Sequence, residues 1–401
     1  MSAVSIRPYF PFCRVRIVRQ SVDVANKVAR LGMEPDGRFR PICHGCGRRQ
    51  RGIHSWRQRW LRDLPVGTTR VWLACRYRRG YCPHCGGYRV EDLEFFAPYQ
   101  RVTRRMARYI HDLCKVLTVK QVATHLGLDW KTVKQVDRAY LEERHSQTDY
   151  SGLRLLAVDE IALRKGHRYM TVVLDYETGR VVWLARERTS DTLKSFFDGM
   201  TVEQKQAVEA IAMDMWDPFI KAVREAAPHV KIVFDLFHVV AAFNRIVDKI
   251  RLAEYRKALA EDKPVYKGSK YLLLVTRQSL RRRDARAHLK ALLQLNQTIA
   301  SVMILREGLN RIWSYRSRAW ASRRLHEWCA LASSLDYHDL HVFARRLQRY
   351  GYGILNHCDY PIHTCRLEGV INKIKLIKRQ AYGYRDERYF SLKVIQAFLP
   401  N

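Results

Sequence analysis

Alternating apolar and polar residues in the first part of the chain predict a β-strand. In the segment TTRVWLACRYRRGYC, residues 68–82, apolar side chains recur at every second position through Val71, Leu73, Cys75 and Tyr77. A period of two places these side chains on one face of a strand. The strand ends beside a pair of cysteines, which indicates that it is one arm of a hairpin that carries them.

Helical spacing replaces this alternation after residue 117. Apolar residues of LTVKQVATHLGLDWKTVKQVDRAYLE, residues 117–142, gather on one face of each of two short helices separated by Gly127. Gly127 allows a tight turn, the small Ala123 lets the helices cross closely, and Asp129 can cap the second helix. An ordinary helical hairpin shares these features, but their combination favours a helix-turn-helix. Its second helix would present the following residues to DNA: Trp130, Lys131, Thr132, Lys134 and Gln135.

From Leu153 onward, short apolar runs predict a mixed sheet. LRLLAVDEIA, RYMTVVLDYETG and RVVWLARER are three consecutive strands, and VEAIAMDMW and HVKIVFDLFHVV are a fourth and a fifth. Capped helical segments, TSDTLKSFFDGM and DPFIKAVREAAP, precede the fourth and the fifth strand. The order β-β-β-α-β-α-β predicts an α/β fold with the mixed sheet of a ribonuclease-H-like core.

Two carboxylates follow buried strands of this sheet. Asp159 comes after the apolar run LLAV, with Glu160 on the opposite face, and Asp214 comes after AIAM. A carboxylate at the end of a buried strand is costly unless it is paired or binds a metal ion. Either residue alone is more simply explained as a cap of its strand. Two neighbouring strands would bring the pair together, which predicts a cation site.

Four of the ten cysteines form two CxxC pairs, PICHGCGRR and GYCPHCGG. The pairs are Cys43 with Cys46 and Cys82 with Cys85, and a glycine after each pair lets the backbone turn. Four thiolates make a closed tetrahedral site for one structural Zn²⁺ ion. A redox role or unpaired thiols would not need two matched pairs.

The charge of the chain points to a polyanionic partner. The formal net charge is +33, of which residues 1–150 carry +16, residues 151–250 carry none and residues 251–401 carry +17. This distribution favours nucleic acid over a membrane surface. In the stretch RVTRRMAR, Arg104 and Arg105 would contact phosphates. We found no long apolar run and no leader pattern at the start, so we expect a cytoplasmic protein associated with the bacterial nucleoid.

These motifs together resemble the DDE transposases of the ISL-three family of bacterial insertion sequences. The resemblance rests on the CxxC pairs, the helix-turn-helix, LAVDEIALRKGHRY, AIAMDMWDPF, VFDLFHVV and RLEGVINKIKLIKRQAYGYR, and it covers nearly the whole chain. It implies a catalytic triad of Asp159, Asp214 and Glu368 that holds two Mg²⁺ ions for DNA strand cleavage and strand transfer. It also implies binding to terminal inverted repeats and to target DNA, with a homodimer on paired ends.

The last quoted segment supports this assignment from its own spacing. On a helix from about Arg366, one face would carry Glu368, Asn372, Lys375 and Arg379, and the apolar residues would gather on the other. An ordinary solvent-exposed helix face would show the same polar pattern. Because Asp159 and Asp214 already predict a cation site, we interpret Glu368 as a metal ligand and the residues after it as DNA contacts.

Between Asp214 and Glu368 the chain is helical and rich in arginine, which predicts a helical insertion domain. Arg281, Arg282 and Arg283 are its densest basic run and would bind DNA. Asp235 and His238 match the Asp-x-x-His signature of similar transposases and would support the active site.

The predicted domains are a zinc-binding domain (1–98), a helix-turn-helix domain (99–150), a first core part (151–243), a helical insertion (244–350) and a final core part with the glutamate helix (351–401). Two other hypotheses remain at this point. The chain could be a non-catalytic, zinc-dependent DNA-binding regulator derived from a transposase, or a nuclease that acts on RNA.

Overall fold

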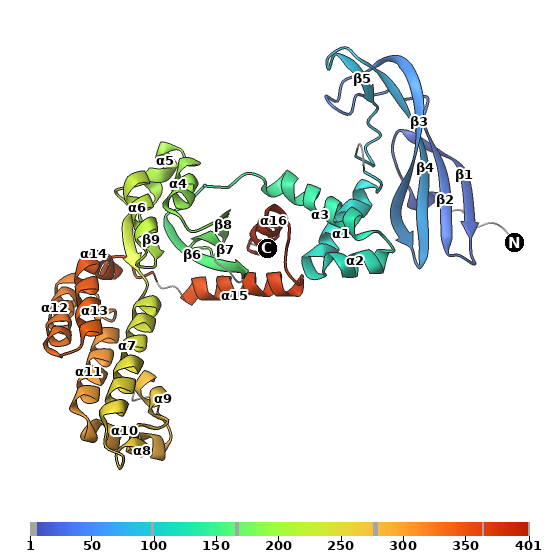
Figure 1. Ribbon diagram of the computed structural model, residues 1–401. Helices are drawn as coiled ribbons and strands as arrows, with labels where there is room; N and C mark the ends of the chain where they lie inside the picture. Colours follow the sequence, from blue (N-terminus) through green and yellow to red (C-terminus); the bar gives the residue numbers. More distant parts are fainter. Residues whose placement is uncertain (1–5, 98–99, 165–167, 276–279, 363–364, 400–401) are drawn as a thin grey trace. The chain divides into compact units, whose positions relative to one another are not determined.

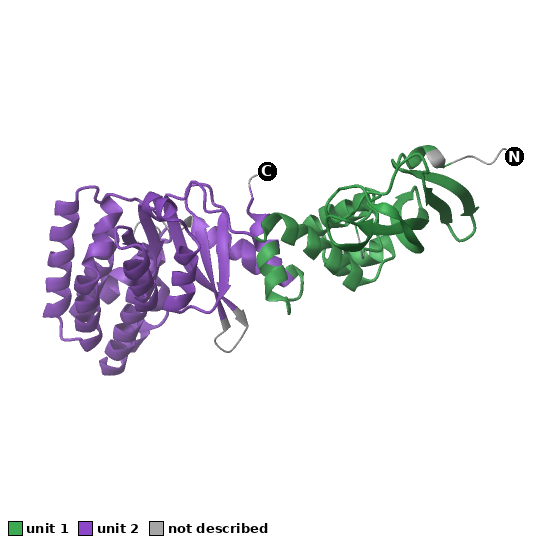
Figure 2. Ribbon diagram, turned by 90° about the horizontal axis from the view of Figure 1, so that it is seen from above, with its two compact units in different colours: residues 1–146, 380–392 green, residues 147–379, 393–401 purple. Residues whose placement is uncertain are grey.

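The computed structural model describes residues 6–97, 100–164, 168–275, 280–362 and 365–399. The chain folds into two compact units, which Figure 2 draws in different colours. Unit 1 comprises Met1–Ser146 and Gln380–Leu392, and unit 2 comprises Gln147–Arg379 and Lys393–Asn401. Within the described ranges, no helix is both long enough and apolar enough to cross a membrane.

Unit 1 begins with a five-stranded sheet (Figure 1). A 3-10 turn, η1 (Arg7–Tyr9), precedes strands β1 (Val15–Asp23), β2 (Val28–Pro35), β3 (Arg51–Val66), β4 (Thr69–Cys82) and β5 (Gly87–Val90). Their order is β1-β2-β4-β3, and β5 pairs with β4. The alternating residues Val71, Leu73, Cys75 and Tyr77 are all buried on β4, as the sequence predicts. β3 and β4 form the expected antiparallel hairpin.

Three helices complete the first part of unit 1: α1 (Arg104–Val116), α2 (Val119–Leu126) and α3 (Trp130–His145). Thr118 and Gln121 form a capping box at the start of α2, and α2 ends at Leu126 with Gly127 as its C-cap, whose φ of 62° suits glycine. The Asp129 carboxylate accepts a hydrogen bond from the backbone N–H of Lys131 at 2.8 Å. The predicted turn at Gly127 and the predicted Asp129 cap are therefore both present.

Unit 2 is built around a second five-stranded sheet with the order β10-β9-β6-β7-β8. The strands are β6 (Leu155–Arg164), β7 (Arg168–Asp175), β8 (Val181–Arg186), β9 (Ala210–Met213) and β10 (Lys231–Phe234). β6, β7 and β8 pair antiparallel, whereas β9 runs parallel to both β6 and β10. Helices α4 (Ser190–Asp198), α5 (Val202–Ala207) and α6 (Asp217–Ala226) connect the strands, so α5 adds to the predicted order.

The fifth strand is shorter than the sequence predicts. The prediction of a strand through HVKIVFDLFHVV is wrong beyond Phe234, where β10 ends. Asp235 caps helix α7 (Leu236–Lys257), and its carboxylate accepts from the backbone N–H of Phe237 at 2.9 Å. Over so short a run, the apolar residues after Asp235 fit the spacing of a strand and that of a helix equally well. The Asp235 cap favours the helix.

A series of helices follows β10 within unit 2. Its helices are α7, α8 (Lys263–Tyr266), α9 (Ser269–Leu274), α10 (Arg283–Leu295), α11 (Gln297–Ile312), α12 (Arg318–Ser334), α13 (His338–Arg349) and α14 (Gly351–Leu355). The short turn η3 (Asn356–Cys358) brings the chain back to the sheet edge, where Asn356 donates to the carbonyl of Ile232 at 2.8 Å.

Two helices close the chain: α15 (Cys365–Gln380) and α16 (Glu387–Ala397). α15 has the two predicted faces. Leu367, Val370, Ile371 and Ile374 are buried, whereas the polar set is exposed: Glu368, Asn372, Lys375 and Arg379. α15 therefore packs by its apolar side and leaves its carboxylate and cations accessible.

Candidate functional site

The strand register of unit 2 brings the predicted aspartates to neighbouring positions. β6 pairs in parallel with β9, and the last paired residues are Ala157 and Ala212. Asp159 and Asp214 each lie two residues further along the chain than this last pair. Asp214 follows the end of β9, but Asp159 lies inside β6, which continues to Arg164 and pairs with β7 there.

A cluster of possible metal ligands forms around Asp214. One ligand atom from each of Asp214, Asp235 and His238 lies within 4.8 Å of the others. The Nδ1 atom of His238 lies in close contact with the Asp214 carboxylate and 4.0 Å from the Asp235 carboxylate. Asp235 is almost fully buried, whereas the other two side chains are about one-third exposed. Carboxylate and imidazole groups suit a divalent cation.

Burial shapes the protonation of this cluster. It lowers the pKa of His238, with help from the Arg245 charge and against the opposing effect of Glu160. The imidazole is therefore neutral near pH 7, which is the form that binds a metal ion.

Asp159 lies in an environment that disfavours an unpaired negative charge. Burial raises the pKa of Asp159 to about 7. Hydrogen bonding from the backbone N–H of Glu160, at 2.7 Å, opposes this shift, and the negative charges of Glu160 and Asp235 reinforce it. A cation bound beside Asp159 would offset this penalty, because an opposite charge stabilises the ionised carboxylate.

α15 lies near the end of β6 (Figure 1). Lys378 donates a hydrogen bond to the carbonyl of Ala162 at 3.1 Å, and the charge of Lys375 acts on Asp159. Glu368 is exposed on the same helix face, two turns before Lys375. Among the described residues, the cluster of mutually close ligand atoms includes neither Glu368 nor Asp159.

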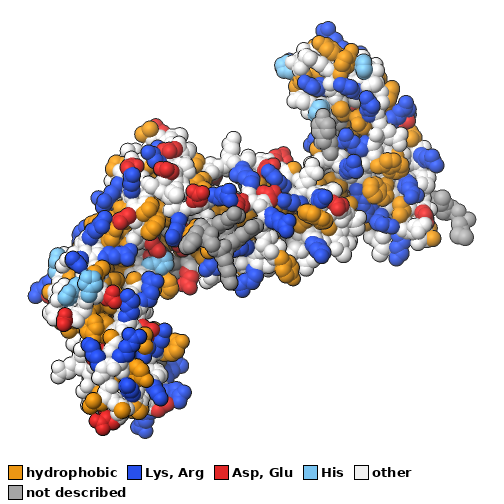
Figure 3. All heavy atoms as spheres, in the orientation of Figure 1, with side chains coloured by type: hydrophobic (Ala, Val, Ile, Leu, Met, Phe, Trp, Pro, Cys, Tyr) orange, Lys and Arg blue, Asp and Glu red, His pale blue; other side chains and the backbone are white. Residues whose placement is uncertain are grey.

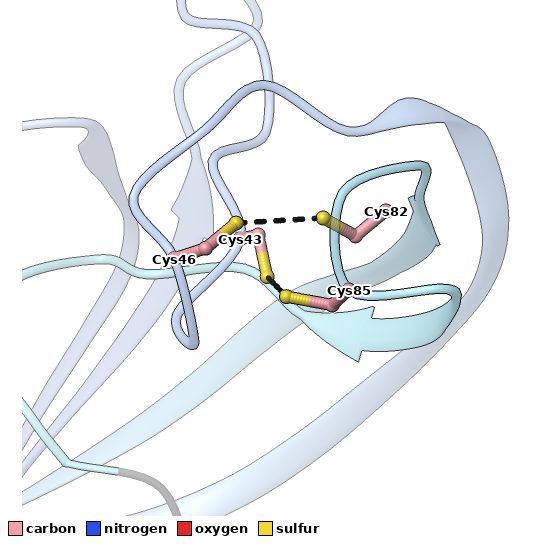
Figure 4. Close-up of side chains that lie close together, drawn as sticks. All are labelled: Cys43, Cys46, Cys82 and Cys85. Atoms are coloured by element: carbon pink, nitrogen blue, oxygen red, sulfur yellow. Dashed lines mark hydrogen bonds between the residues drawn. The ribbon is translucent and has the colours of Figure 1, made fainter.

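The four cysteines of the CxxC pairs come together in unit 1 (Figure 4). Their Sγ atoms lie within 4.8 Å of one another, with 3.8 Å from Cys43 to Cys85 and 3.5 Å from Cys46 to Cys82. Positive φ angles at the glycines after the pairs, 69° at position 47 and 64° at position 86, allow both knuckle turns.

The thiols of this cluster differ in acidity. A hydrogen bond from the backbone N–H of Cys85 lowers the pKa of Cys82 to about 7, whereas hydrogen bonding with Cys46 and burial raise the pKa of Cys85 to about 12. Four thiols at this spacing ionise together only around a cation, so the group could hold a metal ion such as zinc.

The predicted DNA-facing residues of α3 fall into two groups. Trp130, Lys131 and Gln135 are exposed, and Thr132 is half-buried. Lys134 is instead bound to Asp386 at 2.9 Å.

Arg105 is also bound within unit 1. Its guanidinium pairs with Asp63, donates to the Tyr9 carbonyl at 3.0 Å and lies over the rings of Phe10 and Phe12. Arg104 stays exposed, 3.9 Å from Asp92. Arg105 thus anchors α1 to the sheet.

The basic run of the insertion is open to solvent. Arg281, Arg282 and Arg283 are all exposed, and Arg282 pairs with Asp284 at 2.7 Å. On the face shown in Figure 3, Lys and Arg side chains are spread over both units, and red acidic side chains are fewer. This surface agrees with the strongly positive net charge.

Arg188, which bonds to Glu160 next to Asp159, was not expected from the sequence. The Arg188 guanidinium bonds to Glu160 at 3.0 Å and lies over the rings of Tyr169 and Trp216, at 4.2 and 4.9 Å. It comes two residues after the end of β8, an edge strand whose place the sequence order alone does not give.

Comparison with known proteins gives two family matches and several relatives. Residues 156–394 match a family described as "Transposase", and residues 91–141 match the "Helix-turn-helix domain of transposase family ISL3". The transposase of insertion sequence element IS1001 from Bordetella parapertussis is 40% identical over 90% of this chain and 89% of that protein. The transposase of element IS1557 from Mycobacterium tuberculosis is 25% identical over 90% of this chain and 86% of that protein.

Proposed function

The chain belongs to the ISL3 family of transposases, and we propose that it binds the terminal inverted repeats of an insertion sequence and cuts and joins DNA strands there. In this proposal the helix-turn-helix contacts the element ends. Asp159, Asp214 and Glu368 form the catalytic triad, and Asp235 and His238 support it.

The β6–β9 register is the observation that carries this proposal. Asp159 lies in β6, Asp214 follows the end of the neighbouring strand β9, and Asp235 follows the end of β10, which runs parallel to β9. Three antiparallel strands followed by two parallel ones, in the order β10-β9-β6-β7-β8, support a ribonuclease-H-like core. The influence of Lys375 on Asp159 supports the approach of the α15 polar face, and hence of Glu368.

The donor set fits a hard divalent cation. Asp159, Asp214 and Glu368 offer carboxylate oxygens, the ligands that Mg²⁺ prefers in addition to waters and phosphate oxygens. Two Mg²⁺ ions held by these residues would supply activation of the attacking oxygen and stabilisation of charge at phosphorus. Lys375 and Arg379, which follow Glu368 on the same face, would bind the phosphates of the reacting strand.

The remaining parts of the chain would hold DNA and maintain the fold. The four cysteines would bind one Zn²⁺ ion and fix the loops at the end of the β3–β4 hairpin. Two copies of the chain would hold two element ends together, because strand transfer joins both ends to one target.

Substitution of Asp159 tests the catalytic part of the proposal. We expect Asp159→Asn to abolish Mg²⁺-dependent strand transfer on duplexes made from the DNA that flanks the gene, and to leave binding to these duplexes unchanged. The matched control is Asp198→Asn, which removes an exposed carboxylate at the end of α4. Unimpaired strand transfer by the Asp159 variant would exclude the triad.

Two other outcomes would identify a different function. Tight binding to the element ends with no strand transfer by the unmodified chain, in Mg²⁺ or Mn²⁺, would indicate a non-catalytic regulator. Preferential cleavage of RNA–DNA hybrids over element ends would indicate a nuclease that acts on RNA.

A further inference from the structure

A cleft lined by arginine and tryptophan opens in unit 1 beside the start of α3. Its volume is about 640 Å³. The lining residues that matter here come from β3 and β4, from the segment before α1, and from the turn into α3: Arg59, Trp60, Arg62, Trp72, Arg101 and Thr132. The cleft therefore lies between the N-terminal sheet and the N-terminal end of the helix expected to enter DNA.

Arg62 holds the two walls of this cleft together. Its side chain is buried, and its guanidinium donates to the carbonyl of Val71 at 3.2 Å and to that of Leu126 at 3.4 Å. It also lies 5.6 Å above the Trp72 ring. Because Leu126 ends α2 and Val71 belongs to β4, Arg62 fixes the sheet against the helix-turn-helix.

The cleft carries an excess of positive charge. Among its lining residues the acidic one is Asp129, and its carboxylate already caps α3. The nearby carboxylate of Asp63 is taken by the Thr103 hydroxyl at 2.6 Å and by Arg105. The Arg59 guanidinium donates to a backbone carbonyl, that of residue 100, at 3.3 Å. Within the described part of the chain, Arg59 and Arg101 therefore form no ion pair with a carboxylate, and a phosphate group fits beside them.

The sheet face continues the cleft away from α3. Trp56 and Trp60 lie on one face of β3, because they are an even number of residues apart, and they are 43% and 46% exposed. The Arg76 guanidinium lies 4.6 Å from the centre of the Trp56 ring. Across the sheet, Trp60 pairs with Ala74 and Ala74 with Gly32, so small residues leave room beside the exposed rings.

We propose that this cleft and the adjoining tryptophan face bind the sugar–phosphate backbone of the DNA duplex whose major groove α3 enters. Arg59 and Arg101 contact phosphates, and the exposed edge and face of Trp60 pack against a deoxyribose. The N-terminal residues of a recognition helix lie closest to the bases, so the backbone beside them passes the mouth of the cleft. This inference rests on the proposed role of α3, and it extends the protein's contact with DNA to the sheet.

Duplex DNA is favoured over unpaired DNA for a geometric reason. Platforms for single strands present successive aromatic rings on which bases stack. Here the ring of Trp72 is covered by Arg62 and that of Trp56 by Arg76, so guanidinium groups already occupy those faces. Positioning contacts to phosphate and sugar are the ordinary partners of a helix-turn-helix.

The double variant Arg59→Gln/Arg101→Gln tests this inference in the full-length chain. We expect weaker binding to a duplex made from the DNA that flanks the gene. We also expect the slope of log K against log salt to become shallower by about 2, which corresponds to two lost phosphate contacts. Hydroxyl-radical protection of the backbone beside the α3 site should disappear, while major-groove protection from methylation persists. The charge-matched control is Lys115→Ala/Arg144→Ala, at the C-terminal ends of α1 and α3.

A second variant, Trp60→Ala, separates the possible outcomes. Loss of duplex affinity together with the flanking protection supports the inference. Loss of affinity for single-stranded DNA but not for duplex would overturn it and assign the cleft to unpaired DNA. An unmodified chain that binds no duplex would contradict the proposed function itself. An unmodified chain that binds, with an unchanged salt slope in the Arg59/Arg101 variant, would contradict this inference alone.

Discussion

The phenolic hydroxyl of Tyr389 donates a hydrogen bond to the carboxylate of Asp137 at 2.5 Å, across 252 positions of sequence. Both side chains are buried, and His111 Nδ1 contacts the other oxygen of the same carboxylate at 2.7 Å. Burial and the Asp137 charge raise the pKa of Tyr389, so the hydroxyl remains a donor at all ordinary pH values. The segment Gln380–Leu392, which follows the glutamate helix, is thus part of the helix-turn-helix core.

Removal of this hydroxyl should loosen unit 1. Tyr389→Phe removes one hydrogen bond to a buried carboxylate, which costs about 1–3 kcal/mol of unfolding free energy. We expect a lower melting temperature in circular dichroism and weaker binding to the element ends. Tyr382→Phe is the control, because Tyr382 is fully exposed in the same segment. Equal melting temperatures for the two variants would show that the Tyr389–Asp137 bond does not stabilise the unit.

Loss of a metal ion from the four-cysteine cluster should affect the N-terminal sheet before the rest of the chain. We expect the purified chain to contain about one zinc ion, and Cys46→Ser to lose it, because four thiolates are needed to close the site. Cys13→Ser is the control, since Cys13 is exposed and lies outside the cluster. Atomic absorption measures the zinc, and proteolysis of the hairpin loops measures the loss of structure. Full zinc content in the Cys46 variant would exclude the cluster as the site.

The local features of this chain could be predicted because each depends on nearby residues. The period-two pattern of β4, the glycine turn and Asp129 cap of the helix-turn-helix, and the two faces of α15 all follow from spacing within one element. The start of α7 was missed because the apolar run after Asp235 is too short to distinguish a strand from a helix.

Other features depend on contacts between distant segments, and no local sequence pattern predicts them. The Tyr389–Asp137 bond and the bridge from Arg62 to Leu126 each join elements that are far apart in sequence. For the same reason Lys134 and Arg105 looked like free cations, although Asp386 and Asp63 bind them in the fold. Basic residues in a reading helix can thus be structural, and their sequence context does not reveal it.

The Asp235 carboxylate should matter for metal binding rather than for folding. Asn caps a helix about as well as Asp, so Asp235→Asn keeps the cap of α7 and removes only the charge beside Asp159 and His238. We expect strand transfer to require about 10–100-fold more Mg²⁺, and binding to the element ends to be unchanged. Asp191→Asn, an exposed position in the first turn of α4, is the control. An unchanged Mg²⁺ requirement would separate Asp235 from the metal site.

Glu254 should make the insertion domain sensitive to acid. Burial alone would raise its pKa, but hydrogen bonds from Tyr337, Asn296 and Lys257 outweigh burial and lower the pKa from 4.5. A lowered pKa in the folded state means that this stabilisation is present above about pH 4.5 and is lost as the pH falls towards the folded-state pKa.

Replacement of Glu254 by glutamine should therefore change the response to pH. Glu254→Gln should lower stability near pH 7 by about 1–2 kcal/mol and should reduce the loss of stability between about pH 5 and pH 3. Hydrogen exchange of peptides from α7 and α11 measures this effect. Glu261→Gln, at an exposed position, provides the comparison. Parallel pH profiles for the unmodified chain and the Glu254 variant would contradict the prediction.

The arginine run of the insertion should contribute to DNA binding without sequence preference. Arg281→Ala/Arg282→Ala/Arg283→Ala removes three exposed charges, one of which is partly neutralised by Asp284. We therefore expect the salt slope of duplex binding to become shallower by about 2 to 3, and affinity to fall equally for element ends and unrelated duplexes. The charge-matched control replaces Lys194, Lys221 and Lys231, which are exposed on the sheet and its connecting helices in unit 2. If both triple variants change the slope equally, the effect is one of total charge, and the arginine run has no defined contact with DNA.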